Sequence, residues 1–185
     1  MSGADTGGAG AGRPGGAGAG RPGVDALRFR RPTDADHPVI VAGIDEWWGG
    51  RRMRALLPRL WFQHFTATSW IAEDEAGRAV GFLVGFISPD HPDQAYIHMV
   101  GTDPNHRRSG LGRALYERFF QDARSLGART VTAITWPGNR QSVSFHRAMG
   151  FLPADGPGTM NLYGTPGYPD YDADGEDRAV FSRPL

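Results

Sequence analysis

The stretch HRRSGLGRAL, His106–Leu115, joins two arginines and a Gly-x-Gly pair directly to the start of an amphipathic segment. Glycines let a backbone turn tightly or approach a ligand closely, because they carry no Cβ atom. The start of a helix has unpaired N–H groups and a partial positive charge, which together suit a phosphate group. The stretch therefore predicts either a phosphate-binding loop or a tight strand-to-helix turn that binds nothing.

Several other kinds of chemistry are excluded by the residue types that the chain lacks. It has no cysteine, and its 20 basic side chains are all arginine. A cysteine nucleophile, a thiolate metal site, a Schiff-base lysine and a phosphate loop of the G-x-x-x-x-G-K-[ST] kind are therefore ruled out. The histidines show no metal-ligand spacing, and we expect no metal cofactor.

The charge balance of the chain bears on its partners. Its 20 basic and 20 acidic residues give a formal net charge of zero, which offers no electrostatic case for binding nucleic acid or an anionic membrane. We find no run of 18 apolar residues and no N-terminal signal sequence. We therefore expect a cytoplasmic protein with no nucleic-acid or membrane partner.

The composition divides the chain into an arm and a domain. Residues 1–24 are rich in Gly, Ala, Arg and Pro, and the segment GAGAGRPG occurs there twice in succession. Such a segment has few side chains to bury, so we expect a flexible arm. Residues 25–185 are predicted to form one folded domain.

Within this domain, periodic segments predict the elements that position the loop. Strands are predicted at LRFRR, SWIAED, AVGFLVGFIS, QAYIHMV, RTVTAITW and RAVFSRP. Helices are predicted after PTDAD, over RRMRALLPRLWFQHF with a break at Pro58, over Gly110–Leu126 and over RQSVSFHRAMG. The third helix places Leu111, Leu115, Phe119, Ala123 and Leu126 on one stripe. This order predicts a mixed α/β domain whose sheet has antiparallel and parallel parts.

In that context, the segment IHMVGTDPNHRRSGLGRALYERF resembles the acetyl-CoA-binding segment of the GNAT acyltransferase superfamily. Pro104, Arg107, Gly110 and Gly112 occupy the motif positions, and Thr102 stands where valine is usual. A second segment, NRQSVSFHRAMGF, resembles the family pattern N-x-x-[AS]-x-x-F-Y-x-x-x-G-F. The resemblance covers roughly residues 27–151 and the last strand, and it implies a mostly antiparallel sheet, splayed at its centre and flanked by helices.

The resemblance also implies where acetyl-CoA binds. Main-chain N–H groups of the loop would hold the pyrophosphate, while Arg108 and Arg113 either add charge or are solvated. The pantetheine arm would lie in a gap between strands Ile97–Thr102 and Val131–Trp136 and pair with main-chain groups near Val100. Asn139 either binds the same arm or caps a helix. The cofactor-binding residues implied are Val100, Gly101, Thr102, Arg107, Arg108, Ser109, Gly110, Leu111, Gly112, Arg113, Asn139, Ser142 and Phe145.

The chemistry implied is direct attack of a neutral amine on the acetyl thioester in a ternary complex. It needs a route for the amine proton, a donor to the oxyanion and an acid for the leaving thiolate. His146 stands where the family often has a tyrosine that protonates the leaving thiolate. It is either the acid for that step or a polar residue lining the cofactor cleft. Tyr96 stands where family members often have a glutamate base. His98 shares a strand face with Tyr96 and is either the base or a packed histidine.

Aromatic and acidic segments are candidates for the acceptor site. Trp47, Trp48 and Trp61 lie where the family builds one wall of its acceptor pocket, and they either form that wall or belong to the core. The acidic segment YPDYDADGEDR, which contains Tyr171, is either a lid that attracts a cationic amine or a solvated loop.

We therefore expect an acetyl-CoA-dependent N-acetyltransferase that acts on a small-molecule amine. The alternatives are an acetyltransferase for peptide or protein amines and a non-catalytic module that binds acyl-CoA. Because family members are often homodimers, a homodimer is also an expectation from the resemblance.

Overall fold

The computed structural model describes residues 23–185. Its strands are β1 Arg28–Arg30, β2 Trp70–Glu73, β3 Ala79–Ile87, β4 Gln94–Thr102, β5 Thr130–Thr135, β6 Leu152–Pro153, β7 Met160–Leu162, β8 Thr165–Gly167 and β9 Ala179–Pro184. Its α-helices are α1 Asp36–Trp47, α2 Trp61–His64, α3 Leu111–Ser125 and α4 Arg140–Ala148. Short 3-10 helices lie at η1 Val24–Ala26, η2 Arg54–Leu56, η3 Thr66–Thr68 and η4 Pro104–His106. Residues 1–22 of the predicted arm lie outside the described part.

The central sheet has seven strands in the order β1-β2-β3-β4-β5-β9-β6. Every neighbouring pair is antiparallel except β4 and β5, which are parallel. The prediction of a mixed α/β fold with a mostly antiparallel sheet is confirmed. The strands β6, β7 and β8 were not predicted, because they are two or three residues long and lie in a Gly- and Pro-rich segment.

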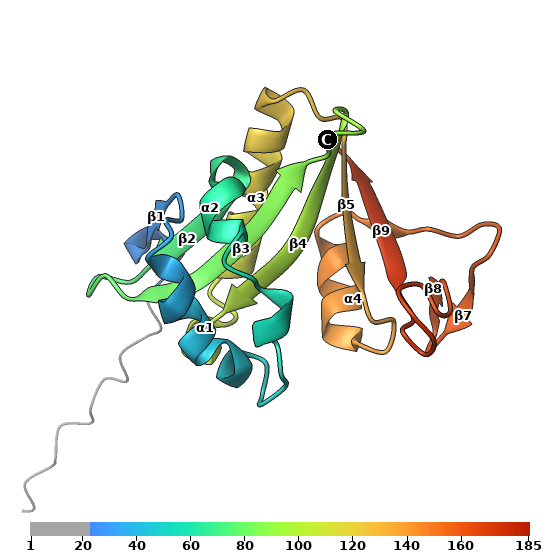
Figure 1. Cartoon of the computed structure of the whole chain (residues 1–185), viewed down its shortest axis with the longest axis horizontal. Coiled ribbons are helices and arrows are strands. Elements are labelled where there is room, and N and C mark those ends of the chain that lie inside the picture. Colours follow the sequence, from blue (N-terminus) through green and yellow to red (C-terminus); the bar gives the residue numbers. More distant parts are fainter. Residues whose placement is uncertain (1–22) are drawn as a thin grey trace, which may run out of the picture.

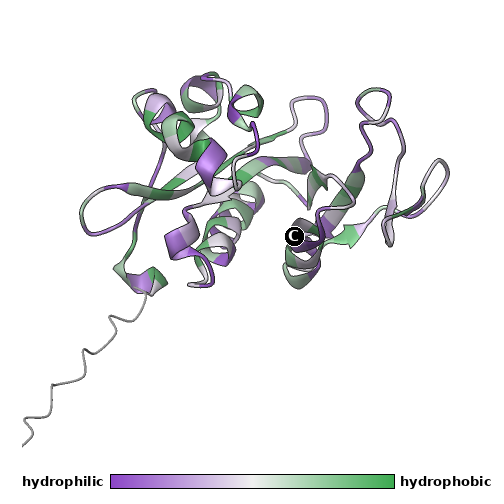
Figure 2. Ribbon diagram, turned by 90° about the horizontal axis from the view of Figure 1, so that it is seen from below, coloured by the Kyte–Doolittle hydropathy of each residue, from purple (hydrophilic) through white to green (hydrophobic). Residues whose placement is uncertain are grey.

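Helices cover both faces of this sheet (Figure 1). On one face, α3 buries Leu111, Leu115, Phe119 and Ala123 against strand residues. On the other, α1 and α2 bury Ile40, Ile44 and Phe62 against β2 and β3. Figure 2 shows hydrophobic residues concentrated in the strands and adjoining helix turns. The predicted stripe of α3 is wrong at Leu126, which is 55% exposed because the helix ends at Ser125.

The predicted break at Pro58 is confirmed. The segment forms η2 before this proline and α2 after it, rather than one helix. Proline has no N–H to donate and its ring clashes with the preceding turn, so a continuous helix cannot pass through it.

The parallel pair at the centre of the sheet is short. Gln94–Ile97 of β4 pairs with Thr130–Ala133 of β5, and beyond these residues the two strands diverge (Figure 1). The β3–β4 register also shifts there: Gly85 lies opposite Ile97, Val84 lies opposite Met99, and His98 has no partner on β3. His98 is thus the extra residue of a β-bulge, which bends the strand as it leaves β5.

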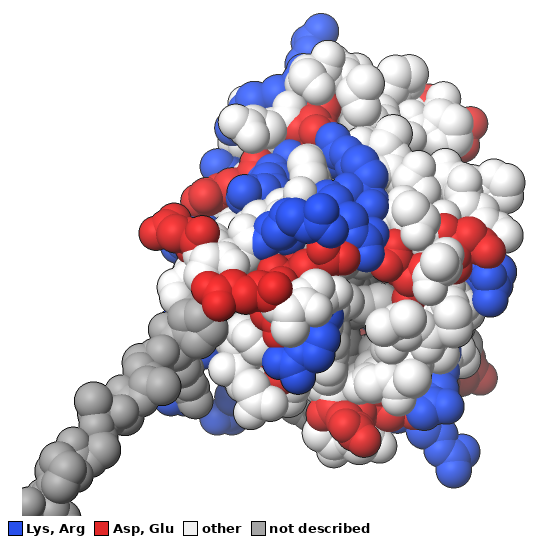
Figure 3. Space-filling view, turned by 90° about the vertical axis from the view of Figure 1, so that its left-hand side faces the viewer, with Lys and Arg blue, Asp and Glu red and all other residues white. Residues whose placement is uncertain are grey.

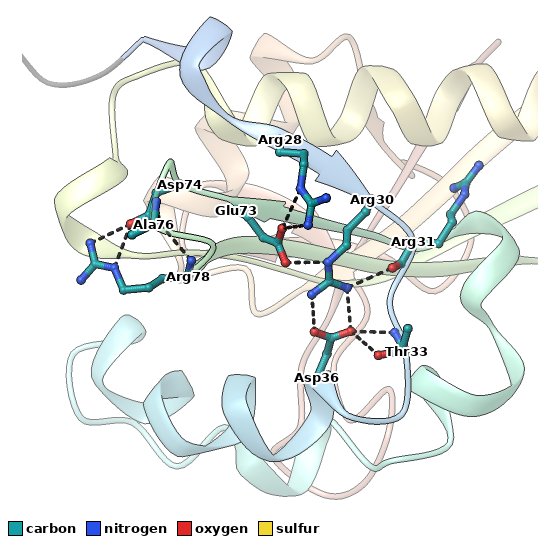
Figure 4. Close-up of polar contacts among 9 residues, drawn as sticks. All are labelled: Arg28, Arg30, Arg31, Thr33, Asp36, Glu73, Asp74, Ala76 and Arg78. Carbon is teal, nitrogen blue, oxygen red and sulfur yellow. Dashed lines mark hydrogen bonds and ion pairs between the residues drawn. The ribbon is translucent and has the colours of Figure 1, made fainter.

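A network of ion pairs attaches α1 to the edge of the sheet (Figure 4). The Arg30 guanidinium donates to both oxygens of Asp36, in the first turn of α1, and its Nε donates to Glu73 on β2. Figure 3 shows arginine and carboxylate groups side by side on the face nearest β1. The network sets the position of the helix whose C-terminal end carries Trp47 and Trp48.

Candidate functional site

The loop between β4 and α3 ends in a helix start that is open to a ligand. Gly110 has φ +89°, and the N–H of Ala114 donates to its carbonyl as the first bond of the helix. The N–H groups of Leu111, Gly112 and Arg113 precede that bond and have no acceptor within the helix. Among the described residues, no side chain caps α3. This terminus can therefore accept an anion.

The backbone of the loop is turned by two left-handed residues, Arg108 with φ +61° and Gly110. Such residues are typical of loops whose N–H groups converge on an anion. Ser109 donates its hydroxyl to the carbonyl of His106, and the Arg107 guanidinium donates to the carbonyl of Trp47. Arg107 therefore ties this loop to the C-terminal end of α1.

The α4 helix packs against the first turn of α3. A Cβ atom on Gly112 would lie 3.4 Å from the ring of Phe145, so the helices α3 and α4 are in close contact at this point. The Asn139 side chain accepts the N–H of Ser142 at 3.2 Å and caps α4. The structure thus shows the capping role of Asn139; its contact with a pantetheine arm stays a prediction.

The end of β4 supplies the main-chain edge that was predicted to bind the same arm. Val100, Gly101 and Thr102 lie in the part of β4 that no longer pairs with β5. A Cβ atom on Gly101 would lie 2.5 Å from Phe82 and 2.7 Å from Trp48, so only glycine fits there. The edge and the loop are continuous in the chain and lie at one end of the sheet (Figure 1).

His146 is buried between α3 and β9 rather than exposed in an open cleft. Its Nδ1 lies 2.8 Å from the carbonyl of Ser142, and its Nε2 lies 3.2 Å from the Tyr116 hydroxyl. A carbonyl only accepts, so Nδ1 carries the proton and Tyr116 donates to Nε2. Burial lowers the pKa of His146, although the bond to Ser142 opposes this. These contacts give His146 a structural role, and its role as an acid stays a prediction.

His98 is held differently. Its ring stacks on Trp61 with centroids 4.4 Å apart and planes at 11°, and its Nε2 lies 2.7 Å from the carbonyl of Leu56. Burial lowers the pKa of His98, while the bond to Leu56 acts in the opposite direction. His98 and Tyr96 were predicted to lie on the same face of β4, and ring contacts support this. His98 stacks on Trp61, and Trp61 and Tyr96 both pack on Phe86.

Tyr96 and the acidic segment lie near each other. Burial raises the pKa of Tyr96 to about 12, and the charges of Tyr171 and Asp172 add to this effect. The segment is braced by Arg178, which pairs with Asp172 at 2.8 Å and with Glu176 at 2.7 Å. The structure thus brings Tyr171, predicted to bind substrate, toward β4.

The predicted aromatic wall divides into two parts. Trp47 and Trp48 are half-buried at the end of α1 and pack on Phe82. Trp61 is only 8% exposed and belongs to the core beside α1 and α2. The carbonyl of Leu56 and the hydroxyl of Tyr116 contact predicted site residues, but neither group was predicted from the sequence. Neither has a sequence signal, since the partner of a backbone carbonyl or a buried hydroxyl is set by tertiary packing.

A groove lies away from the predicted site. It has a volume of about 790 Å³ and follows the outer side of α3, where Arg113, Arg118, Arg124 and Arg183 line it with Trp70 and Phe120. Of the predicted site residues, only Arg113 borders it. In the described part of the chain, no cluster of three or more His, Asp or Glu side chains could hold a metal ion, and no helix is long and apolar enough to span a bilayer.

Comparisons with known proteins show the family of the chain. The model of the acetyltransferase (GNAT) family matches residues 37–151. An L-2,4-diaminobutyric acid acetyltransferase of Nocardia farcinica is 31% identical over 90 residues, which are 49% of this chain and 46% of that protein. The chain thus spans about half the length of this curated relative.

Solved structures share the fold. Ard1 from Thermoplasma volcanium has a TM-score of 0.68 at 20% identity, with 86% of this chain and 98% of that chain covered. A diaminobutyrate acetyltransferase from Paenibacillus lautus, in complex with L-2,4-diaminobutyric acid and coenzyme A, has a TM-score of 0.60 at 22% identity, with 84% and 93% covered.

Proposed function

The chain belongs to the acetyltransferase (GNAT) family, and we propose that it transfers the acetyl group of acetyl-CoA to a primary amine of a small molecule. The observation that carries this proposal is the start of α3, which no described side chain caps, beside the diverging ends of β4 and β5. The first feature offers N–H groups to the pyrophosphate, and the second offers a main-chain edge to the pantetheine arm. The names of the relatives support a small amino acid as the acceptor.

The transfer is proposed to run in one ternary complex. The chain has no cysteine to form a thioester with the acetyl group, so the amine attacks acetyl-CoA directly. An N–H group of β4 near Val100 stabilises the oxyanion that forms. The C–S bond then breaks, and coenzyme A leaves as a thiolate, which takes up a proton from water. His98 is our candidate for the base that receives the amine proton.

The acceptor is proposed to enter between the end of α1 and the acidic segment. Trp47 and Trp48 supply an aromatic wall, and the segment around Tyr171 supplies negative charge that attracts a cationic amine. A homodimer stays a prediction from the resemblance.

The cofactor part of the proposal can be tested with a matched pair of glycines. Gly110 and Gly127 lie at the two ends of α3 and have φ +89° and +90°. Aspartate at either position is strained to a similar degree, but only Gly110→Asp places a carboxylate where the pyrophosphate is proposed to bind. Calorimetric titration with acetyl-CoA should give binding for the wild type and Gly127→Asp and loss of binding for Gly110→Asp.

Equal binding by both variants would contradict the phosphate-loop assignment. The transfer itself is tested by thiol release in a screen of small amines that includes 2,4-diaminobutyrate. Release only with peptide amines would move the acceptor class to peptides. Tight acetyl-CoA binding with no release from any amine would leave a non-catalytic acyl-CoA-binding module.

A further inference from the structure

We propose that Trp61 and the main-chain carbonyl of Leu56 are positioning groups that hold His98 in one tautomer, with Nδ1 free to take the amine proton. The inference rests on the proposed function, because it needs an amine to deprotonate. It gives Trp61 a different role from the substrate wall that its sequence position predicts.

The hydrogen bond fixes the tautomer. His98 Nε2 lies 2.7 Å from the oxygen of Leu56, and a carbonyl oxygen can only accept. Nε2 therefore carries the proton, and in a neutral imidazole Nδ1 then keeps its lone pair. Leu56 ends the short helix η2, which Asp45 of α1 secures by accepting the N–H of Met53 at 2.8 Å. The acceptor of the His98 proton is thus a fixed part of the fold.

The stack on Trp61 fixes the ring plane. Trp61 itself packs against Phe65 at 4.7 Å and Phe86 at 6.0 Å between ring centroids, and it is 8% exposed. A ring held on one face by a buried indole and at one nitrogen by a carbonyl has little freedom to rotate. Trp61 contacts the base rather than open solvent.

The remaining nitrogen is accessible. In the described part of the chain, the buried side-chain nitrogen and oxygen atoms without a partner are Nδ1 of His37 and Nδ1 of His106. His98 Nδ1 is not among them and forms no hydrogen bond with a described residue, so it is not fully buried. His98 is also the bulged residue directly after Ile97, where β4 and β5 cease to pair. The base therefore stands where the two strands begin to diverge.

The surroundings keep the ring neutral. Burial is the main cause that lowers the pKa of His98, and the bond to Leu56 is the only other contributor among the described residues. Tyr96, two residues earlier on the same face, stays protonated because its pKa is raised to about 12. Two charged groups that act on the pKa of that tyrosine, Asp172 and Arg178, are paired with each other. At neutral pH the ring is therefore uncharged and able to accept a proton.

The proton balance of the step is simple. The amine nitrogen forms a bond to the acetyl carbon, and the carbonyl π electrons move to oxygen. The nitrogen becomes acidic as this bond forms, and its proton moves to Nδ1 of His98. When the carbonyl re-forms, the C–S bond breaks and coenzyme A leaves as a thiolate. His98 afterwards releases the proton to water.

Long-range ¹H–¹⁵N NMR of the imidazole rings tests the geometry without any substrate. The wild type should show His98 as the Nε2–H tautomer at pH 7, titrating below the ordinary value of about 6.5. Trp61→Leu should mix the two tautomers and move the titration up, because burial is reduced. His37, whose Nε2 lies 3.1 Å from the carbonyl of Leu57, is the internal control, and its tautomer should be the same in both proteins.

Kinetics then separate positioning from substrate binding. Trp61→Leu should lower kcat by about 10- to 100-fold, as displacement of a catalytic group by about 1 Å does, and leave the Kd of acetyl-CoA unchanged. The acid limb of the pH–rate profile should move up in parallel with the NMR titration. Trp61→Phe retains a ring for stacking and should recover most of the loss. Trp70→Leu, which removes a β2 tryptophan that packs on the α3 side of the sheet, should leave the His98 titration unchanged.

Three results would overturn the inference. The first is an Nδ1–H tautomer in the wild type, and the second is a Trp61→Leu titration identical to that of the wild type. The third is a rise in the amine KM alone, which would make Trp61 a substrate wall. If no amine is acetylated but the NMR results are as expected, the proposed function is wrong and the catalytic role of His98 is overturned with it. The fixed geometry of the His98 ring would still stand.

Discussion

Replacing Glu73 by glutamine should destabilise the protein in a way that depends on pH. Glu73 is 4% exposed, and its carboxylate accepts bonds from Nε of Arg30 at 2.6 Å and from Arg28 at 2.6 and 3.0 Å (Figure 4). A hydrogen bond to a charged group is worth about 1.5–3 kcal/mol net. The Arg28 side chain is 73% exposed, so solvent screens most of its share. We therefore expect a loss of about 2 kcal/mol, mainly from the bond to Arg30.

The expected loss converts to a measurable change in melting temperature. One kcal/mol shifts Tm by about 2–4 °C in a domain of this size, so Glu73→Gln should lower Tm by about 4–8 °C at pH 7. Asp74→Asn is the matched control, because Asp74, next to Glu73, pairs with Arg78, whose side chain is 75% exposed. That variant should melt close to the wild type.

The pH dependence follows from the direction of the pKa shift. Burial acts to raise the pKa of Glu73, but the bonds from Arg28 and Arg30 outweigh it and leave the pKa below its ordinary value. A carboxyl whose pKa is lowered by folding stabilises the protein above its unfolded pKa, and this contribution is lost as the pH falls through the folded pKa. The Tm gap between wild type and Glu73→Gln should therefore narrow below about pH 4.3. A gap that stays constant down to pH 3 would refute the electrostatic account and leave packing as the cause.

Three further variants test other parts of the structure. Gly101→Ala should cost about 1–3 kcal/mol in urea denaturation, because its Cβ atom would overlap Phe82 and Trp48, and unchanged stability would contradict that packing. Tyr116→Phe removes the donor to buried His146 Nε2 and should cost about 1–3 kcal/mol with kcat unchanged. A fall in kcat at full stability would instead support His146 as the acid. Asp172→Asn should raise the KM of a diamine a few-fold in initial-rate assays and leave that of acetyl-CoA unchanged; equal effects on both would argue against an acidic entrance.

Most of the fold could be predicted from local pattern. Alternation and helical periodicity predicted six strands and the main helices. Each of these elements buries one face, so its apolar residues recur with the period of a strand or a helix. The short strands β6 to β8 carry no such pattern and pair only because tertiary packing brings them together. The turn between β4 and α3 could also be predicted, since glycine favours a positive φ and a helix starts immediately after Gly110.

The roles of individual side chains were harder to predict from the sequence. His146 and His98 look alike in the sequence, yet the first is buried with both ring nitrogens bound and the second keeps one nitrogen free. Their difference depends on Tyr116, Ser142 and Leu56, of which only Ser142 lies within one helical turn of its histidine. Sequence spacing identifies residues that could titrate, but long-range contacts decide which of them can exchange a proton with a ligand.

The bulge in β4 shows how a single extra residue reorganises the site. Strict alternation would place Val100 on the same face as Tyr96 and His98. Because His98 has no partner on β3, the alternation resets after it: Met99 packs with α1 and α2, whereas Val100 packs on the α3 side. Gly101 then faces Trp48, which brings the aromatic wall to the strand edge. Had the same residues alternated strictly, Met99 and Gly101 would face away from the wall, so the bulge, as much as the histidine, shapes the proposed acceptor side.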